Sequence, residues 1–155
     1  MADTLTPAER SERMSRIRSC DTKPEIALRK ALHGLGFRFR LHSRRLPGKP
    51  DIVLPKHRTV VFVHGCFWHR HRGCKVATTP KTNTSFWVEK FDRNQSRDRR
   101  NGEALATAGW RVIVVWECEL GTPAKVDSRA GELAADIILQ GRLRQPLVSA
   151  WVPPA

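Results

Sequence analysis

Two short apolar runs separated by four turn-forming residues constrain the fold more than any other feature of the sequence. Residues 51–54 read Asp-Ile-Val-Leu, residues 59–64 read Thr-Val-Val-Phe-Val-His, and Pro-Lys-His-Arg lies between them. Runs of this length and composition around a turn predict a β-hairpin. Counting outward from the turn pairs Leu54 with Thr59. The hairpin therefore brings the acid that starts the first run close to the histidine that ends the second.

The remaining elements follow from apolar periodicity and helix caps. Thr6-Pro-Ala-Glu and Thr22-Lys-Pro-Glu both match the capping box that opens a helix. Residues 110–116, Trp-Arg-Val-Ile-Val-Val-Trp, are apolar on both faces, as expected of a central strand. The other predicted elements are helices over 7–19, 23–35, 93–109 and 127–139, a helical opening over 86–91 and a strand over 37–41.

This order of elements predicts an α/β fold with one mixed sheet flanked by helices, in which residues 110–116 run parallel to a hairpin strand. The length of 155 residues is enough for one domain with a real core. We expect a single domain over 1–155, with an arm over 1–20 and an irregular tail over 141–155.

A large excess of positive charge points to a polyanionic partner. The chain has 28 Lys and Arg against 15 Asp and Glu, a formal net charge of +13, and a pI near 10.8. Nucleic acid is the first candidate partner. Basic side chains gather in the arm, in the loop over 42–49 and in the helix over 93–109. Those expected to contact DNA are Arg13, Lys49, Arg97 and Arg99.

The helix over 7–19 has Met14 and Ile17 as its only large apolar residues, which is little surface for docking. It is either an arm that binds DNA or a solvated helix lying on the core. No run reaches the length of a transmembrane helix, and the first seven residues lack the apolar core of a signal peptide. We therefore expect a cytoplasmic protein without membrane contact, whose reduced cysteines are available to metals.

Cysteines and histidines follow the hairpin at the spacing of a metal site. Three thiolates and one imidazole form a closed tetrahedral set, the pattern of a structural Zn²⁺. The predicted ligands are Cys66, His71, Cys74 and Cys118. His69 could replace His71, and Cys20 is a rival for the fourth position. The remaining alternative is four buried cysteines with no metal.

The acid and histidines left over indicate a second, catalytic metal. Asp51 at the start of a strand is a good ligand for Mg²⁺, and the carbonyl of Val63 would be a second. Mg²⁺ stabilises the charge that develops in phosphodiester cleavage, and His64 or His69 would deprotonate the attacking water. Glu25 would orient that histidine or reach the metal through water. Each residue also has a structural alternative: a cap for Glu25, a turn acid for Asp51, a core histidine for His64.

Longer motifs connect these residues to a known family. They are Pro47-Gly-Lys-Pro-Asp51, His64-Gly-Cys-Phe-Trp-His69, Phe86-Trp-x-Glu-Lys90, Arg97-Asp-Arg-Arg100, and Gly109-Trp-Arg-Val112 through Val115-Trp-Glu-Cys118. From about Ser11 to Cys118 the chain resembles the very-short-patch repair (Vsr) mismatch endonucleases.

The resemblance implies a restriction-endonuclease-like fold of the PD-(D/E)xK type, in which Phe62-x-His64 replaces the usual motif of the second strand. It also implies a Mg²⁺-dependent nick 5′ to the thymine of a T:G mismatch. Such mismatches arise when 5-methylcytosine deaminates, and the nick starts short-patch repair. Asp51 resembles the Mg²⁺ ligand and His69 the general base, with Glu25 and His64 in support. The zinc ligands of the family agree with those predicted from spacing.

Three aromatic residues resemble a wedge that enters the base stack beside the mismatch, namely Phe67, Trp68 and Trp87. An aromatic ring stacked on a base is worth about 1–3 kcal/mol, which offsets unstacking at a mispair. The alternative for these rings is ordinary core packing. Met14 resembles a contact in the minor groove.

The chain also departs from the family pattern. Gly73 looks like an insertion in the metal loop, and Arg70 and Arg72 stand where the family tends to have histidines. These changes put the readout of bases around the mismatch in question. Trp110 and Trp116 lie on the predicted strand and are assigned to the core.

Three other functions compete with this interpretation. The protein could nick at a different mispair, damaged base or sequence context, or be a non-catalytic, zinc-stabilised DNA-binding module, or be a zinc hydrolase of small substrates. Asp51 and its histidines argue against pure binding, and a closed zinc site with three cysteines argues against hydrolysis at the zinc. We expect a monomer that acts on mismatched duplex DNA; the sequence identifies no repair-protein partner.

Overall fold

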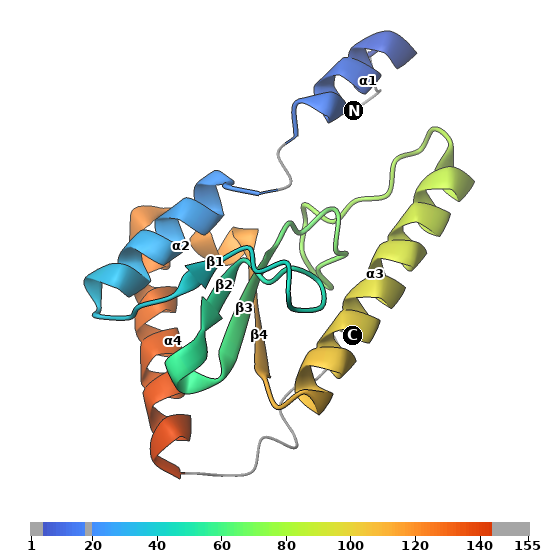
Figure 1. The fold of residues 1–155 in the computed structure, drawn as a ribbon. Helices are drawn as coiled ribbons and strands as arrows, with labels where there is room; N and C mark the ends of the chain where they lie inside the picture. Colours follow the sequence, from blue (N-terminus) through green and yellow to red (C-terminus); the bar gives the residue numbers. More distant parts are fainter. Residues whose placement is uncertain (1–4, 18–19, 144–155) are drawn as a thin grey trace.

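A four-stranded mixed sheet forms the centre of the fold in the computed structural model, which describes residues 5–17 and 20–143 (Figure 1). The strands lie side by side in chain order: β1 (Arg40–Leu41), β2 (Ile52–Leu54), β3 (Thr59–His64) and β4 (Arg111–Trp116). β1, β2 and β3 pair antiparallel, and β3 pairs parallel to β4. The predicted hairpin is confirmed with its register, because Leu54 pairs with Thr59.

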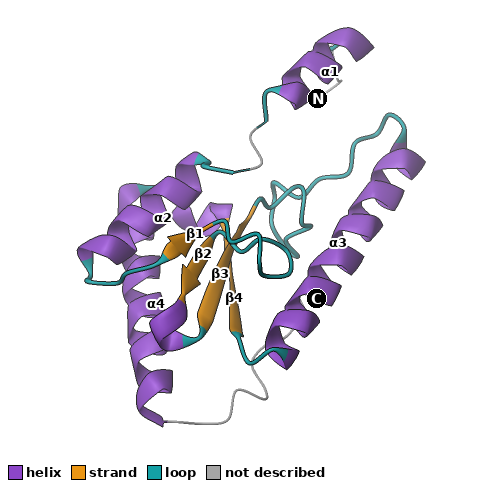
Figure 2. Cartoon of the chain, in the orientation of Figure 1, coloured by secondary structure: helices purple, strands orange, loops and turns teal. Residues whose placement is uncertain are grey.

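The helices cover both faces of this sheet, as Figure 2 shows. The covering helices are α2 (Lys23–Gly34), α3 (Thr84–Thr107) and α4 (Pro123–Leu143), and a further helix, α1 (Pro7–Ser15), precedes them in the chain. Alternation along the strands divides the apolar side chains between two clusters. One cluster joins Ile52 and Val61 of the sheet to α2 and α4, and the other joins Val53 and Val60 to Leu105 of α3. The predicted mixed α/β architecture is confirmed.

Several predicted elements differ from the structure. β4 lies at an edge of the sheet rather than at its centre. Both faces of β4 are apolar because helices cover both sides of the sheet. This cover does not require a further strand beside β4. The strand expected over 37–41 is reduced to its last two residues, and the openings at 86–91 and 93–109 belong to one helix, α3.

The two capping boxes also differ. Thr6 forms the full box, accepting from the Glu9 N–H at 3.3 Å while the Glu9 carboxylate accepts from the Thr6 N–H at 2.8 Å. At α2 the Thr22 hydroxyl instead donates to Glu25 at 3.2 Å, and no N–H of the helix bonds to Thr22 through its side chain. The prediction of a second complete box is therefore wrong. Glu25 is only 4% exposed, so its carboxylate faces the interior.

α1 stands apart from the sheet and its covering helices (Figure 1). It has no buried residue, which fits the predicted arm better than a helix packed on the core. The helix expected over 7–19 ends earlier, at Ser15. The helix expected over 127–139 is longer at both ends, so residues 141–143 of the predicted irregular tail are helical. Residues 1–4, 18–19 and 144–155 lie outside the described residues. Within the part of the chain that the structure describes, no helix is both long and apolar enough to cross a membrane.

Candidate active site and metal cluster

A cleft of about 1120 Å³ opens where β3 ends, between α3, the loop before β2 and the start of α2. It collects many of the residues singled out in the sequence, although they come from distant segments. Those that line it are Met14, Glu25, Lys49, Asp51, Val63, His64, Trp68, His69 and Arg97. Phe67, Trp87, Arg13 and Arg99 do not line it.

The hairpin fixes one oxygen of Asp51. The residue directly precedes β2, and its Oδ2 accepts a hydrogen bond of 2.7 Å from the Val63 N–H on β3. Burial raises the pKa of Asp51 to about 6, against the effect of this hydrogen bond, and the nearby Glu25 carboxylate raises it further. Two carboxylates inside one cleft are unfavourable unless a cation compensates their charge. Asp51 and Glu25 are thus suited to hold a divalent cation.

The imidazole nearest Asp51 is not the one expected. The sequence places His64 beside this acid, but the structure groups Asp51 with Glu25 and His42, whose ligand atoms all lie within 4.8 Å. His42 Nδ1 lies 3.8 Å from Asp51 Oδ1. The prediction that Glu25 orients His64 or His69 names the wrong histidine. The imidazole beside Glu25 is that of His42. Sequence reasoning treated His42 only as the start of a basic loop.

The other two histidines form a separate pair against α3. The rings of His64 and His69 stack with centroids 3.9 Å apart and an angle of 8° between planes. His69 Nδ1 lies 2.6 Å from Asp98 Oδ2. Because a carboxylate only accepts, Nδ1 carries the proton and Nε2 is left with a free lone pair. Asp98 was not predicted as a site residue, because it lies in a run of arginines. The available signal was that it is the one acid in that run.

His64 is suited to a neutral role. It is 6% exposed, and burial lowers the pKa of His64 to about 3, with a further lowering from His69. Its Nδ1 has no hydrogen-bond partner in the structure. A neutral ring stacked on His69 fixes the orientation of that imidazole without adding positive charge.

The four predicted zinc ligands come together at the ends of β3 and β4. Cys66, His71, Cys74 and Cys118 place one ligand atom each within 4.8 Å of the others. His71 Nδ1 lies 3.5 Å from the sulfur of Cys66 and 3.3 Å from that of Cys118. Burial raises the pKa of Cys66 to about 12, so its thiolate requires a cation nearby. The chemistry of this donor set fits Zn²⁺.

The rival ligands lie elsewhere. His69 is held by Asp98, and Cys20 lies with Asp21 and His42. His71 is instead oriented by Trp116, whose ring stacks on it at 4.3 Å with an angle of 6°. The assignment of Trp116 to the apolar core is therefore incomplete, since this side chain supports a metal ligand.

Aromatic side chains form a cluster between the metal loop and α3. Phe67 contacts Trp68 and Trp87 edge-on, with centroids 5.1 and 5.7 Å away. Trp87 is only 7% exposed, whereas Phe67 and Trp68 are half-buried. Lys90 lies 5.1 Å above the Trp68 ring. Of these three rings only Trp68 lines the cleft. The buried Trp87 fits the alternative of core packing better than the wedge role that the resemblance implies for it. Trp110 packs on the second apolar cluster, as predicted.

Comparison with known proteins shows which family the chain belongs to. The family described as DNA mismatch endonuclease Vsr matches residues 2–75. The DNA mismatch endonuclease Vsr of Escherichia coli is 45% identical over 130 residues, covering 84% of this chain and 83% of that protein. The chain belongs to the Vsr family. The resemblance seen in its motifs is confirmed.

Two further proteins that match this chain are named as type II nicking enzymes. The type II nicking enzyme V.XorIIP of Xanthomonas oryzae pv. oryzae is 50% identical over 129 residues, which cover 83% of this chain and 94% of that protein. The type II nicking enzyme V.NmeAIP of Neisseria meningitidis is 48% identical over 137 residues, 88% of this chain and 97% of that protein. The similarity spans the cleft and the metal cluster.

Replacing one thiolate of the cluster tests the metal site. Cys118→Ser should lower the zinc content of the purified protein and destabilise it by several kcal/mol, because binding of a structural zinc contributes to folding. Metal analysis and thermal unfolding measure both effects. Cys20→Ser is the matched control and should keep both values. Equal zinc content in Cys118→Ser and wild type would contradict the assignment.

Replacing Asp51 by Asn tests the cost of its buried charge. The folded-state pKa is raised from 3.8 to about 6, so ionisation makes the folded protein less stable as pH rises through this window. Without added Mg²⁺, Asp51→Asn should therefore gain on the order of 2 kcal/mol over wild type above the window and little below it. Denaturant unfolding at several pH values measures the difference. The exposed Asp92→Asn is the control, and a pH-independent gain in Asp51→Asn would contradict the prediction.

Proposed function

We propose that this chain is a Mg²⁺-dependent endonuclease that nicks one strand of duplex DNA 5′ to the thymine of a T:G mismatch. The observation that carries the proposal is one cleft in which the buried Glu25 and the half-buried Asp51 stand together with the Asp98–His69 pair. Its relatives are named as mismatch and nicking endonucleases. The sheet order and the hairpin acid support a restriction-endonuclease-like fold of the PD-(D/E)xK type.

Asp51 would hold the Mg²⁺, with the Val63 carbonyl as a second ligand and Glu25 acting through water. This oxygen donor set suits a hard cation. When bound, the cation supplies Lewis-acid stabilisation of the charge that develops on the phosphate. The Val63 N–H keeps Oδ2 of Asp51 in place, so the carboxylate is oriented before the metal arrives.

His69 would take the proton of the attacking water. Its Nδ1–H donates to Asp98, which leaves Nε2 as the base and stabilises the imidazolium that forms. The neutral His64 stacked on it keeps the ring plane fixed. This divides the roles that the sequence left open, with His69 as the base and His64 in support.

Basic and aromatic side chains around the cleft would hold and deform the duplex. Lys49 and Arg97 line the cleft and would bind phosphates. The exposed Arg99 on α3 and Arg13 on α1 extend this surface, while Met14 would contact the minor groove. The proposed wedge residues are Phe67 and Trp68. The buried Trp87 would support them from behind.

Unstacking costs least at a mispaired base, so such a wedge favours mismatched sites. Zn²⁺ on the Cys66, His71, Cys74 and Cys118 set would hold the segment that carries Phe67, Trp68 and His69. The structural metal would thereby fix the wedge and the base relative to Asp51. We infer that the protein acts as a monomer in the bacterial cytoplasm and that its nick starts short-patch repair.

Replacing Asp51 by Ala separates catalysis from folding. Loss of the metal ligand removes several kcal/mol of transition-state stabilisation, so nicking of a T:G duplex should fall by about 10³-fold or more. Gel assays with Mg²⁺ measure the rate, and metal analysis should find the zinc content unchanged. Asp92→Ala, at an exposed position of α3, is the matched control.

Full nicking by Asp51→Ala would refute the mechanism. A wild-type protein that binds duplex DNA in a salt-sensitive way but cleaves it with no divalent metal would instead identify a binding module.

A further inference from the structure

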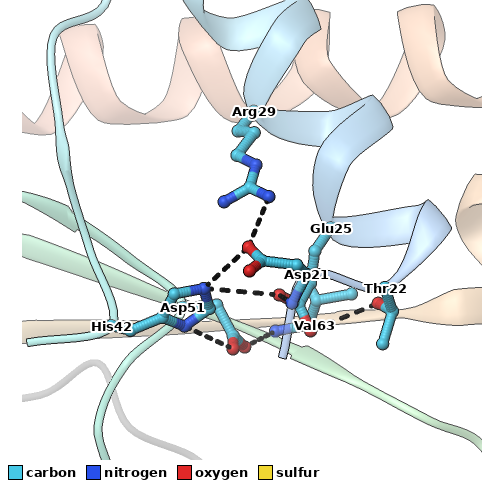
Figure 3. Close-up of polar contacts among 7 residues, drawn as sticks. All are labelled: Asp21, Thr22, Glu25, Arg29, His42, Asp51 and Val63. Carbon is cyan, nitrogen blue, oxygen red and sulfur yellow. Dashed lines mark hydrogen bonds and ion pairs between the residues drawn. The ribbon is translucent and has the colours of Figure 1, made fainter. Parts of the chain in front are cut away.

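His42 lies among three carboxylates at the wall of the cleft (Figure 3). It directly follows β1, while Asp21 and Glu25 come from the start of α2 and Asp51 from the start of β2. Its Nε2 is 3.3 Å from Asp21 Oδ1 and 3.8 Å from Glu25 Oε2. Its Nδ1 is 3.8 Å from Asp51 Oδ1. The imidazole therefore faces a different acid with each ring nitrogen.

The contact with Asp21 sets which nitrogen carries the proton. Carboxylates only accept hydrogen bonds, so Nε2–H donates to Asp21. Asp21 is itself held by Arg29, whose guanidinium donates to the same Oδ1 at 2.6 Å. Histidines that bind metals commonly donate their second N–H to a carboxylate in this way. The Arg29–Asp21 pair thus orients His42 from the side away from Asp51.

The other ring nitrogen of His42, Nδ1, then faces Oδ1 of Asp51 without a hydrogen bond between them. In this tautomer Nδ1 presents a lone pair toward Asp51 Oδ1 at 3.8 Å, which is too long for a hydrogen bond. Two acceptors that face each other inside a cleft repel unless a cation lies with them. Two ligands with bonds of about 2.1 Å to one ion lie at most about 4.2 Å apart, so the spacing suits a shared ion.

We propose that His42, through Nδ1, is a further ligand of the divalent cation held by Asp51 and Glu25. This inference rests on the proposed function, because it concerns the same cation. One ring nitrogen of His42 and one carboxylate oxygen of each acid already lie within 4.8 Å of one another. Asp21 is the positioning residue that keeps the imidazole turned toward the ion.

A nitrogen ligand changes the metal that the site prefers. Carboxylate and carbonyl oxygens alone suit Mg²⁺, whereas imidazole favours transition metals. His42 should therefore raise the affinity for Mn²⁺ relative to Mg²⁺. Loss of His42 should narrow the difference in affinity between Mn²⁺ and Mg²⁺. The Zn²⁺ content of the thiolate cluster should not change.

Electron paramagnetic resonance of bound Mn²⁺ tests the ligand directly. The full zinc-loaded chain is titrated with Mn²⁺ without DNA, and electron spin echo modulation detects ¹⁴N coupled to the bound ion. Wild type should show this coupling, and His42→Gln should lose it. His33→Gln, at an exposed position of α2, is the matched control and should keep it, as should His69→Gln. Asp21→Asn should weaken Mn²⁺ binding about tenfold, because His42 loses its orienting carboxylate.

Failure to bind Mn²⁺, or a nitrogen coupling absent from wild type or retained in His42→Gln, would overturn the inference. These outcomes are distinct from failure of the proposed function. A protein that binds Mn²⁺ through His42 but nicks no T:G duplex would refute the function and leave the ligand assignment standing. Nicking without nitrogen coupling would refute the ligand assignment alone.

Discussion

The parallel register of β3 and β4 is the constraint on which the rest of the site depends. His64 at the end of β3 pairs with Trp116 at the end of β4. Cys66 follows the end of β3 by two residues, and Cys118 follows the end of β4 by two residues. One register therefore brings together the cysteines of two distant segments. A slip of one residue would turn one of them to the opposite face of the sheet. Strand pairing thereby sets where two of the four candidate zinc ligands meet.

The same strands position the residues proposed for catalysis. The N–H of Val63, one residue before the end of β3, holds Asp51, and the next residue, His64, stacks on His69. The loop that follows β3 is therefore anchored twice, by the cysteine cluster and by the Asp98 contact from α3. The cleft then combines a few buried acids with the surface of a chain of net charge +13. In the proposed function, that contrast would let a polyanion approach while the acids hold a cation.

Local patterns predicted the parts of the fold that depend on neighbours in sequence. The hairpin and its register follow from the spacing of Leu54 and Thr59 around a short turn. The cysteine cluster follows from close spacing plus one thiol at the end of a strand. The position of β4 did not follow, because a strand that is apolar on both faces reports cover by helices and not neighbours in the sheet.

The pairing of acids with histidines was also beyond the sequence. Asp98 reaches His69 from a helix 29 residues away in the chain, and His42 meets Asp51 only because β1 pairs beside β2. Both contacts depend on tertiary packing, which no local spacing records. The residue types were visible, but their partners were set by the arrangement of the sheet and α3.

The protein is proposed to cut one strand of duplex DNA at a mismatch. This activity is tested most directly with duplexes labelled separately on each strand, in matched, T:G and other mispaired forms and in several flanking contexts, at one stated salt concentration. With Mg²⁺, the account predicts a single nick 5′ to the thymine of the T:G pair, in the thymine strand, and no cut in the matched duplex. Equal cleavage of matched duplex, or cuts in both strands, would contradict it.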